Sequence, residues 1–196
     1  MLISSQVRVL TDCFRNGSIF ILIQKQTTMK SQSLKLIANL DFFTKEALRG
    51  LEPNEAALSF NLKSWQKAGK IIILKNGLYL LGERWEKEPD KEGYSEFLAN
   101  KIYEPSYLSG EYVMSKYGLL TEAVYGLSSV TTQKTKVFKN KLGVFSYSSI
   151  TPSFFTGFKI ENGLRARTIA GKAKAVFDYL YFRFLKETPM NEKEVE

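Results

Sequence analysis

The most constraining feature of this sequence is a pair of short apolar runs on either side of Asn76-Gly77. Residues 71–74 are Ile-Ile-Ile-Leu and residues 78–81 are Leu-Tyr-Leu-Leu. Asn-Gly between two apolar runs is the strongest short signal for a β-hairpin, because a type I′ turn needs a positive φ at both central residues. The sequence therefore predicts a hairpin over residues 71–81 with a turn of this type.

Three helical patterns precede the hairpin. Apolar residues at helical spacing predict a first helix over residues 31–42. Thr44 is a suitable N-cap for a short second helix that ends near Gly50. A third helix is predicted over residues 53–68, since it begins with proline and is followed by glycine. Three helices and a hairpin are the element order of a winged helix-turn-helix, which we predict for residues 29–82.

The predicted third helix has two different faces. Leu58, Leu62 and Trp65 recur at helical spacing and are expected to pack inward. The opposite side carries lysines, an amide and a hydroxyl but no acid, on Ser59, Lys63, Gln66, Lys67 and Lys70. Such a face suits the DNA major groove, where an amide reads adenine and ammonium groups contact guanine or phosphate. Lys75 and Asn76 at the hairpin tip complete the predicted DNA-binding set. A solvated face in a protein-binding winged helix is the alternative.

The charge distribution favours a polyanionic partner such as double-stranded DNA. The chain has a formal charge of +8, from 28 basic and 20 acidic residues. Residues 29–82 hold eight basic and four acidic residues, and residues 95–184 hold twelve and six. Residues 83–94 and 185–196 are acidic, and they are predicted to be a charged linker and a flexible tail. Basic surfaces bind nucleic acid partly by releasing counterions from phosphates.

Cysteine and histidine usage argues against an enzyme or a metalloprotein. Cys13 is the single cysteine and there is no histidine. One cysteine cannot form an internal disulfide, which fits a reducing cytoplasm, and a thiolate–imidazole zinc site within one chain is excluded. Gly17-Ser18 is not followed by the Asp-x-Asp pair of a nucleotidyltransferase, and there is no Glu-x-Lys, Walker or Gly-x-Gly-x-x-Gly motif. We expect no catalytic residues, no metal and no cofactor.

Residues 1–28 contain an apolar run over residues 19–23. Five residues cannot span a bilayer and are short for the core of a signal peptide, so no membrane association is expected. Two interpretations of this segment stay open. Either translation starts at Met29, or residues 1–28 form an extra strand.

Residues 95–184 are predicted to form a second domain of mixed α/β structure with a small antiparallel sheet, which makes the whole chain α+β. Helical patterns start near Phe97 and Tyr107, and a closing helix covers residues 173–184. Strands are predicted over residues 128–132, 136–138, 143–147 and 164–169. Basic side chains gather around these strands, on Lys134, Lys136, Lys139, Lys141, Arg165 and Arg167. They indicate either a surface for nucleic acid or an acidic partner, or lysines that block edge-to-edge strand pairing.

The second domain resembles the AbiEi family, the antitoxins of bacterial abortive-infection toxin–antitoxin systems often called type IV. Short motifs in a fixed order carry the resemblance, namely Tyr107-Leu108-Ser109, residues 117–122, Val130-Thr131, Gly143, Phe145, Tyr147, residues 150–152, residues 154–158, Ile169-Ala170, Lys174 and residues 178–181. With the winged helix included, the resemblance covers residues 31–184.

The resemblance implies two activities. The winged helix would repress the promoter of its own operon, as a transcriptional regulator. The second domain would counteract a nucleotidyltransferase-type toxin encoded alongside, with or without direct contact. The alternative function is a stand-alone winged-helix repressor whose second domain dimerises or senses a ligand.

Overall fold

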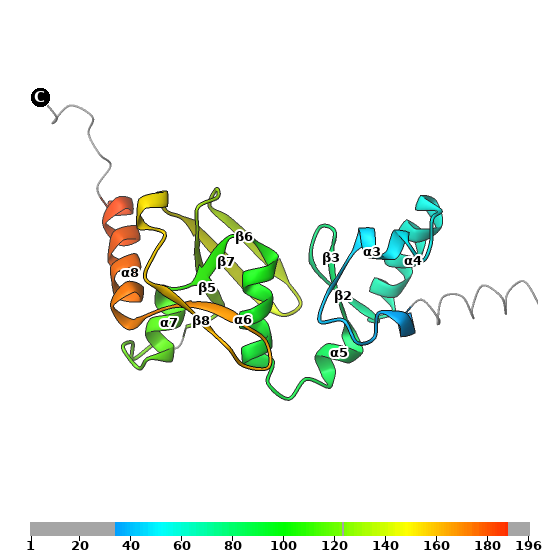
Figure 1. Ribbon diagram of the computed structural model, residues 1–196, viewed down its shortest axis with the longest axis horizontal. Coiled ribbons are helices and arrows are strands. Elements are labelled where there is room, and N and C mark those ends of the chain that lie inside the picture. The colour runs from blue at the N-terminus through cyan, green and yellow to red at the C-terminus, as the bar shows by residue number, and fades with distance from the viewer. Residues whose placement is uncertain (1–33, 123, 188–196) are drawn as a thin grey trace, which may run out of the picture. The chain divides into compact units, whose positions relative to one another are not determined.

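The computed structural model describes residues 34–122 and 124–187 (Figure 1), so the predicted segment 1–28 lies outside the described residues. The described part is α+β, with helices and two sheets. The chain divides into two compact units, and the boundary falls between Ile71 and Ile72. This boundary lies inside the predicted domain 29–82, so the hairpin falls in the second unit. There, the Asn140 amide donates a hydrogen bond to the Leu74 carbonyl at 3.1 Å.

The described part of the first unit starts within helical residues. Residues 34–36 are helical and residues 37–39 form a turn, so the helix predicted to reach residue 42 ends earlier. The reason is a tightening of the chain into i→i+3 hydrogen bonds, such as Leu40 N–H to the Ile37 carbonyl at 3.0 Å. Strand β1 (Phe43–Thr44) and helix α3 (Lys45–Arg49) follow. The Thr44 hydroxyl accepts from the Ala47 N–H, as expected of its N-cap.

Helix α4 (Glu55–Lys67) is capped at both ends. The Asn54 side chain accepts from the backbone N–H groups of Ala56 and Ala57 at 3.0 and 3.1 Å. At the other end Gly69 has a φ of +69°, and the N–H of Lys70 donates to the carbonyl of Trp65. This pattern is a Schellman motif, for which glycine is favoured because it adopts a positive φ without strain. The helix predicted over residues 53–68 is therefore present but shorter, because Asn54 and not Pro53 begins it and Ala68 is already the C-cap.

The predicted hairpin is present as β2 (Ile71–Lys75) and β3 (Leu78–Leu81), in a three-stranded sheet of order β1-β3-β2. The predicted type I′ turn is wrong. Gly77 has a φ of +80°, whereas Asn76 does not have a positive φ. A single positive φ is enough to close the turn, and Gly77 provides it without the strain that Asn76 would carry.

The predicted linker, residues 83–94, is largely helical. Helix α5 (Gly82–Glu86) and the start of α6 (Lys91–Ile102) occupy most of it. Asp90 caps α6 by accepting from the Gly93 N–H at 2.8 Å. The charged residues of this segment therefore lie in helix caps and on helix surfaces. Acidic residues are stabilised at the start of a helix by the free backbone N–H groups there.

The second unit contains a six-stranded sheet of order β6-β7-β5-β4-β9-β8. Its strands are β4 (Ser106–Leu108), β5 (Leu127–Thr131), β6 (Lys136–Asn140), β7 (Gly143–Ser149), β8 (Phe158–Glu161) and β9 (Arg167–Ala170). The pairs β5–β7 and β4–β9 are parallel and the others are antiparallel. The sheet is thus mixed and larger than the small antiparallel sheet we predicted, since parallel pairing joins strands distant in the sequence.

Three further differences concern the strands of this sheet. Tyr107 and Leu108 lie in strand β4 and not in the predicted helix, because helix α7 (Glu111–Lys116) begins only after Gly110. Strand β8 was not predicted, and the strand predicted over residues 164–169 begins at Arg167. The strands predicted over residues 128–132, 136–138 and 143–147 are confirmed as β5, β6 and β7.

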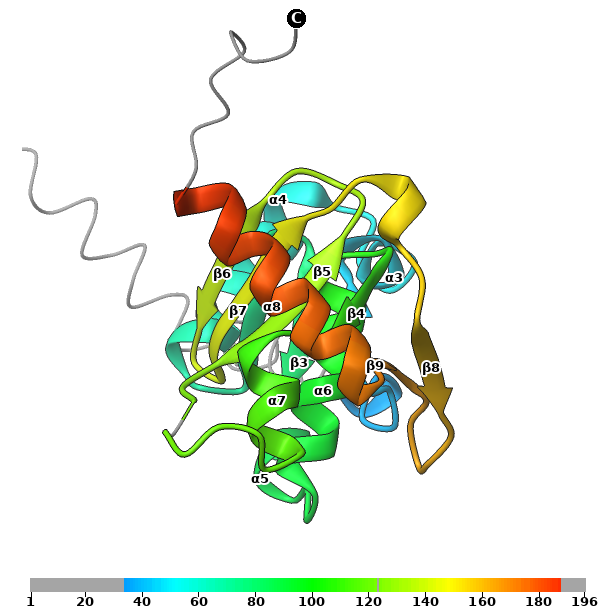
Figure 2. The same cartoon turned by 90° about the vertical axis from the view of Figure 1, so that its left-hand side faces the viewer.

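Helices cover both faces of this sheet. Figures 1 and 2 show α7 and the closing helix α8 (Lys172–Glu187) on one face and α6 on the other. A short 3-10 turn, η1 (Pro152–Phe154), precedes β8. Phe145 and Tyr147 are buried towards α6, where the Tyr147 hydroxyl donates to the Ala99 carbonyl at 2.5 Å. Burial of such large side chains supplies most of the driving force for folding, about 1.5–3 kcal/mol each.

The N-cap of α4 gives a test of how this helix is held. Asn54→Ala removes the acceptor for two backbone N–H groups and should lower the free energy of unfolding by about 1 kcal/mol. Asn54→Asp keeps the acceptor and should stay near the parent value. Urea unfolding of the full chain, followed by circular dichroism, measures both. Equal losses in the two variants would contradict the capping role.

Candidate functional site

Helix α4 presents a cationic face to solvent. Lys63, Gln66 and Lys67 are exposed and Ser59 is half-buried, while Leu58, Leu62 and Trp65 are buried as predicted. Lys70 is also exposed, but it follows the end of the helix. Among the residues that the structure describes, no carboxylate forms an ion pair with a lysine of this group. We call Ser59, Lys63, Gln66 and Lys67 the α4 face.

The single acid of α4 is held away from this face by helix α3. Glu55 lies in the first turn, where Lys45 pairs with its carboxylate and the Arg49 Nε lies 3.2 Å from its Oε2. Hydrogen bonds from Lys45 and then Arg49 hold the pKa of Glu55 below its usual value. The α4 face therefore carries positive charge that no neighbouring acid on the helix neutralises.

One residue beside the α4 face was not predicted from the sequence. Phe60 has 65% of its surface exposed and lies about one turn before Lys63 and two turns before Lys67 on the outer side of the helix. Its position off the buried stripe of Leu58, Leu62 and Trp65 is visible in the sequence. An exposed aromatic ring beside lysines adds an apolar contact surface, of the kind that meets a thymine methyl group or a sugar.

The tip of the hairpin was also predicted to contact DNA. Asn76 is exposed at the turn and Lys75, the last residue of β2, is half-buried. Neither position requires a special backbone conformation, since the positive φ of the turn falls on Gly77. The side chains of both residues are thus free to vary without disturbing the turn.

The predicted lysines of the second unit lie on edge strand β6 and the turns beside it. Lys134, Lys136, Lys139 and Lys141 are all exposed. Alternation along the strand places Lys136 and Lys139 on opposite faces of the sheet. The Lys136 ammonium lies 5.1 Å from the centre of the Phe138 ring and 5.9 Å from that of Tyr103, within range of cation–π attraction.

Arg165 and Arg167 do not join these lysines, which corrects the predicted basic surface. In the sheet, β9 is separated from β6 by three strands. The Arg165 Nη2 lies 2.8 Å from Oε2 of buried Glu88, and the guanidinium stacks 3.9 Å above the centre of the Tyr94 ring. Arg167 forms an ion pair with another buried acid, Glu96. Buried carboxylates need a paired cation, so both arginines act within the fold.

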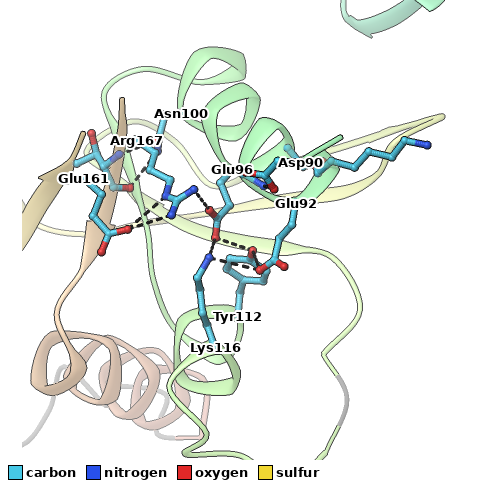
Figure 3. A network of polar contacts seen from close by, with 12 residues as sticks. Asp90, Glu92, Glu96, Asn100, Tyr112, Lys116, Glu161 and Arg167 are labelled. Atoms are coloured by element: carbon cyan, nitrogen blue, oxygen red, sulfur yellow. Dashed lines mark hydrogen bonds and ion pairs between the residues drawn. The ribbon is translucent and has the colours of Figure 1, made fainter. Parts of the chain in front are cut away.

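Figure 3 shows the network that holds Arg167. Glu96 on α6 has no exposed surface, and its carboxylate lies 2.9 Å from Arg167 Nη1 and 2.5 Å from Lys116 Nζ. The Tyr112 hydroxyl donates to Glu96 at 2.7 Å, and burial together with this bond raises the pKa of Tyr112 far above its usual value. Arg167 also pairs with Glu161 at 3.3 Å. One carboxylate thus joins α6, α7 and β9.

A second buried acid joins strand β4 to helix α8. Asp178 accepts from the Ser109 hydroxyl at 2.7 Å and from the Tyr107 hydroxyl at 3.0 Å, and the Lys174 ammonium lies 2.8 Å from it. Burial, followed by the Asp178 charge, raises the pKa of Tyr107. All four residues belong to the motifs of the AbiEi resemblance. Because Ser109 and Asp178 are completely buried, these two side chains maintain the fold and cannot contact a partner directly.

A cavity of about 390 Å³ opens where strands β4 and β9 diverge. The two strands pair only at Leu108 and Ile169. Beyond that point the Asn100 side chain replaces the missing ladder, since its amide donates to the Ser106 and Thr168 carbonyls and accepts from the Thr168 N–H. Phe155, Phe158 and Ile160 line the apolar side of the cavity.

Neither a search of protein-family models nor a search of curated proteins finds a match to this chain. Over residues 34–122 and 124–187 there is no group of three or more acidic, cysteine or histidine side chains that could hold a metal ion. No helix in the same ranges is both long and apolar enough to span a membrane.

The Glu96 network predicts an asymmetric response to two isosteric substitutions. Glu96→Gln leaves Arg167 and Lys116 without their buried counter-charge and should lower the free energy of unfolding by roughly 2–3 kcal/mol. Glu104→Gln breaks an exposed pair with Lys101 and should cost less than about 1 kcal/mol. Urea unfolding of the full chain compares them. Similar losses from the two substitutions would show that Glu96 is not essential to the network.

Proposed function

We propose that this chain is a transcriptional regulator that binds double-stranded DNA through a winged helix-turn-helix at residues 29–82. The observation that carries the proposal is the α4 face, an exposed helix surface with lysines, an amide and a hydroxyl and no unpaired acid. A DNA-binding helix needs such a surface, because phosphates and base edges are rich in hydrogen-bond acceptors. The order of α3, α4 and the β2–β3 hairpin agrees with this class of fold.

In this proposal α4 enters the major groove. Lys63 and Lys67 contact phosphates or guanine, and Gln66 reads adenine through its amide. The hairpin acts as the wing, with Lys75 and Asn76 on the backbone or in the minor groove. The Asn54 cap and the Schellman motif fix both ends of α4, so its backbone needs no further ordering when its side chains engage DNA.

We further propose that the regulator is an antitoxin of the AbiEi type, which represses its own promoter and counteracts a nucleotidyltransferase-type toxin encoded beside it. This half rests on the resemblance of residues 31–184. The resemblance motifs that lie around Asp178 are interior ones, so they support a shared fold more than a shared contact surface. The protein would act in the cytoplasm, without catalysis, metal or cofactor.

One observation favours the alternative, a winged-helix repressor whose second domain senses a ligand. The cavity beside Asn100 has a volume in the range of small-molecule sites, with aromatic side chains on one wall. It is open to solvent, and the polar side chain at its base, Asn100, is already satisfied by backbone groups. The antitoxin proposal therefore remains the better supported one.

The α4 face predicts how DNA affinity depends on salt. Lys63→Ala with Lys67→Ala should weaken promoter binding and lower the slope of log affinity against log salt by about 1–2 units, because each lysine releases counterions from one phosphate. Fluorescence anisotropy with a labelled promoter fragment at several salt concentrations measures the slope.

Lys87→Ala with Lys101→Ala is the matched control, since it removes the same charge from lysines that pair with Glu83 and Glu104. This control should leave the slope unchanged. Gln66→Ala should instead reduce the preference for the operator over random duplex. If both double variants lose the same slope, general charge and not the α4 face controls binding.

The two proposed activities should separate in cells. Lys63→Ala with Lys67→Ala should derepress a reporter driven by the chain's own promoter, yet still protect cells that express the neighbouring toxin at a fixed level. Expressing the variant from an unrelated promoter keeps its amount equal to that of the parent. Point variants suit this test better than a fragment starting at residue 95, which would cut helix α6. Loss of protection together with repression would refute a separate antitoxin domain.

A further inference from the structure

The outer side of helix α8 is apolar and exposed. Apolar side chains recur along it every three or four positions, at Ala173, Phe177, Leu180 and Phe184, which we call the α8 stripe. Phe177 and Leu180 are each 42% exposed, and Phe184 is 62% exposed. Figures 1 and 2 show α8 on the outside of the second unit, with no other element of that unit over it. The stripe is therefore open to a partner.

An aromatic ring outside α8 widens the stripe. Phe154 of η1 is 43% exposed, and its ring centre lies 5.7 Å from that of Phe177 and 5.7 Å from that of Tyr181. Phe177 and Tyr181 stack on each other at 5.9 Å. These contacts order the Phe177 side chain before any partner binds, which lowers the entropic cost of association. Contiguous exposed apolar surface marks a site of protein association.

The spacing of the stripe selects a helix as the partner. Steps of four, three and four residues are those of the a and d positions of a heptad, whose side chains pack into a second helix. The opposite side of α8 already packs within the second unit, where Ala175 and Asp178 are completely buried. The heptad pattern therefore serves a second contact, and it does so on the solvent side.

The sizes of the four side chains fit a second copy of α8 that runs in the opposite direction. In that register Ala173 opposes Phe184 of the partner subunit, and Phe177 opposes Leu180 of the partner subunit. The smallest side chain then meets a large one, which fills the interface without a void. A parallel pair would instead set Phe184 against the same residue of its partner and leave a gap between two alanines.

Charge also favours an antiparallel copy. Helix α8 has no acid in its first turn, and Lys172 is exposed there. Residues 188–196, which follow the helix, include three glutamates and one lysine. Antiparallel pairing brings this acidic sequence of one copy towards the basic start of α8 in the other, where the helix dipole also favours negative charge. Parallel pairing would bring the two acidic sequences together.

We propose that the second unit forms a homodimer through the α8 stripe, with the two helices antiparallel about a two-fold axis. The stripe lies wholly in the second unit and shares no residue with the predicted DNA-binding set, so the dimer does not depend on DNA binding. A helix of 16 residues is roughly 24 Å long. The interface is therefore small, and we expect a dimer Kd of about micromolar. Dimerisation would give the proposed regulator two α4 faces for a repeated operator.

The test is sedimentation velocity of the full chain without DNA, at concentrations from below to well above the micromolar range. The parent should shift from the 22.4 kDa monomer to a dimer. Leu180→Glu should raise the dimer Kd by at least about a hundredfold, since the substitution acts twice at a two-fold interface, about tenfold each time. Leu164→Glu is the matched control, because it changes an 87% exposed leucine outside the stripe and should keep the parent Kd.

A mixing experiment tests the antiparallel register. Ala173→Glu and Phe184→Lys should each dimerise more weakly than the parent, yet associate when mixed, because the new carboxylate then opposes the new ammonium group. Both positions are exposed, so circular dichroism of each variant should match the parent. Mixed variants that do not associate would overturn the antiparallel arrangement. A monomeric parent, or a parental Kd in Leu180→Glu, would overturn the dimer. Dimerisation only after removal of residues 1–28 would instead assign the stripe to that segment of the same chain.

Discussion

A carboxylate without exposed surface, Glu96, is the constraint on which the second unit depends. Burial of an ionised carboxylate costs several kcal/mol unless cations and hydrogen bonds surround it. Arg167 and Lys116 meet this need from β9 and α7, and Tyr112 adds a hydroxyl. Asp178 of α8 is also buried, and Lys174, Tyr107 and Ser109 surround its carboxylate in the same way. The two acids therefore fix how the helices sit on the sheet.

These buried acids also determine the surface. Cations that serve Glu88, Glu96 and Asp178 are withdrawn from solvent, so the net charge of the unit is displayed by lysines that have no acid nearby. In the second unit these include Lys134, Lys136, Lys139 and Lys141, on β6 and the turns beside it. In the first unit, Lys45 and Arg49 of α3 form ion pairs with Glu55, the single acid of α4. The α4 face is therefore left with basic side chains and no acid. The ion pairs within each unit therefore decide which lysines remain unpaired and give the surface its positive potential.

Local chemistry made residues 44–81 largely predictable. Thr44, Asn54, Gly69 and Gly77 mark caps and a turn through interactions with residues close in sequence, and the helix and hairpin positions follow from them. The chain after residue 82 was harder because its decisive contacts are long-range. Arg165 finds Glu88 across 77 residues, and β5 pairs in parallel with β7. Tyr107 and Leu108 have the spacing of a helix, but pairing with β5 and burial against Asp178 place them in a strand.

The Asn100 side chain lies where backbone pairing in the six-stranded sheet is interrupted, between β4 and β9. Along this line β4 and β9 share one residue pair, and an amide from α6 substitutes for the rest of the backbone ladder. The β8–β9 ribbon is thus attached to β4 by one backbone pair, by the Asn100 amide and by the stacked rings of Tyr107 and Phe158. The Arg167–Glu96 ion pair attaches the ribbon to α6. The β6-β7-β5-β4 part is held instead by continuous backbone ladders. The place of β8 and β9 in the sheet therefore depends on side chains of α6, and substitutions in that helix should affect these two strands more than the other four.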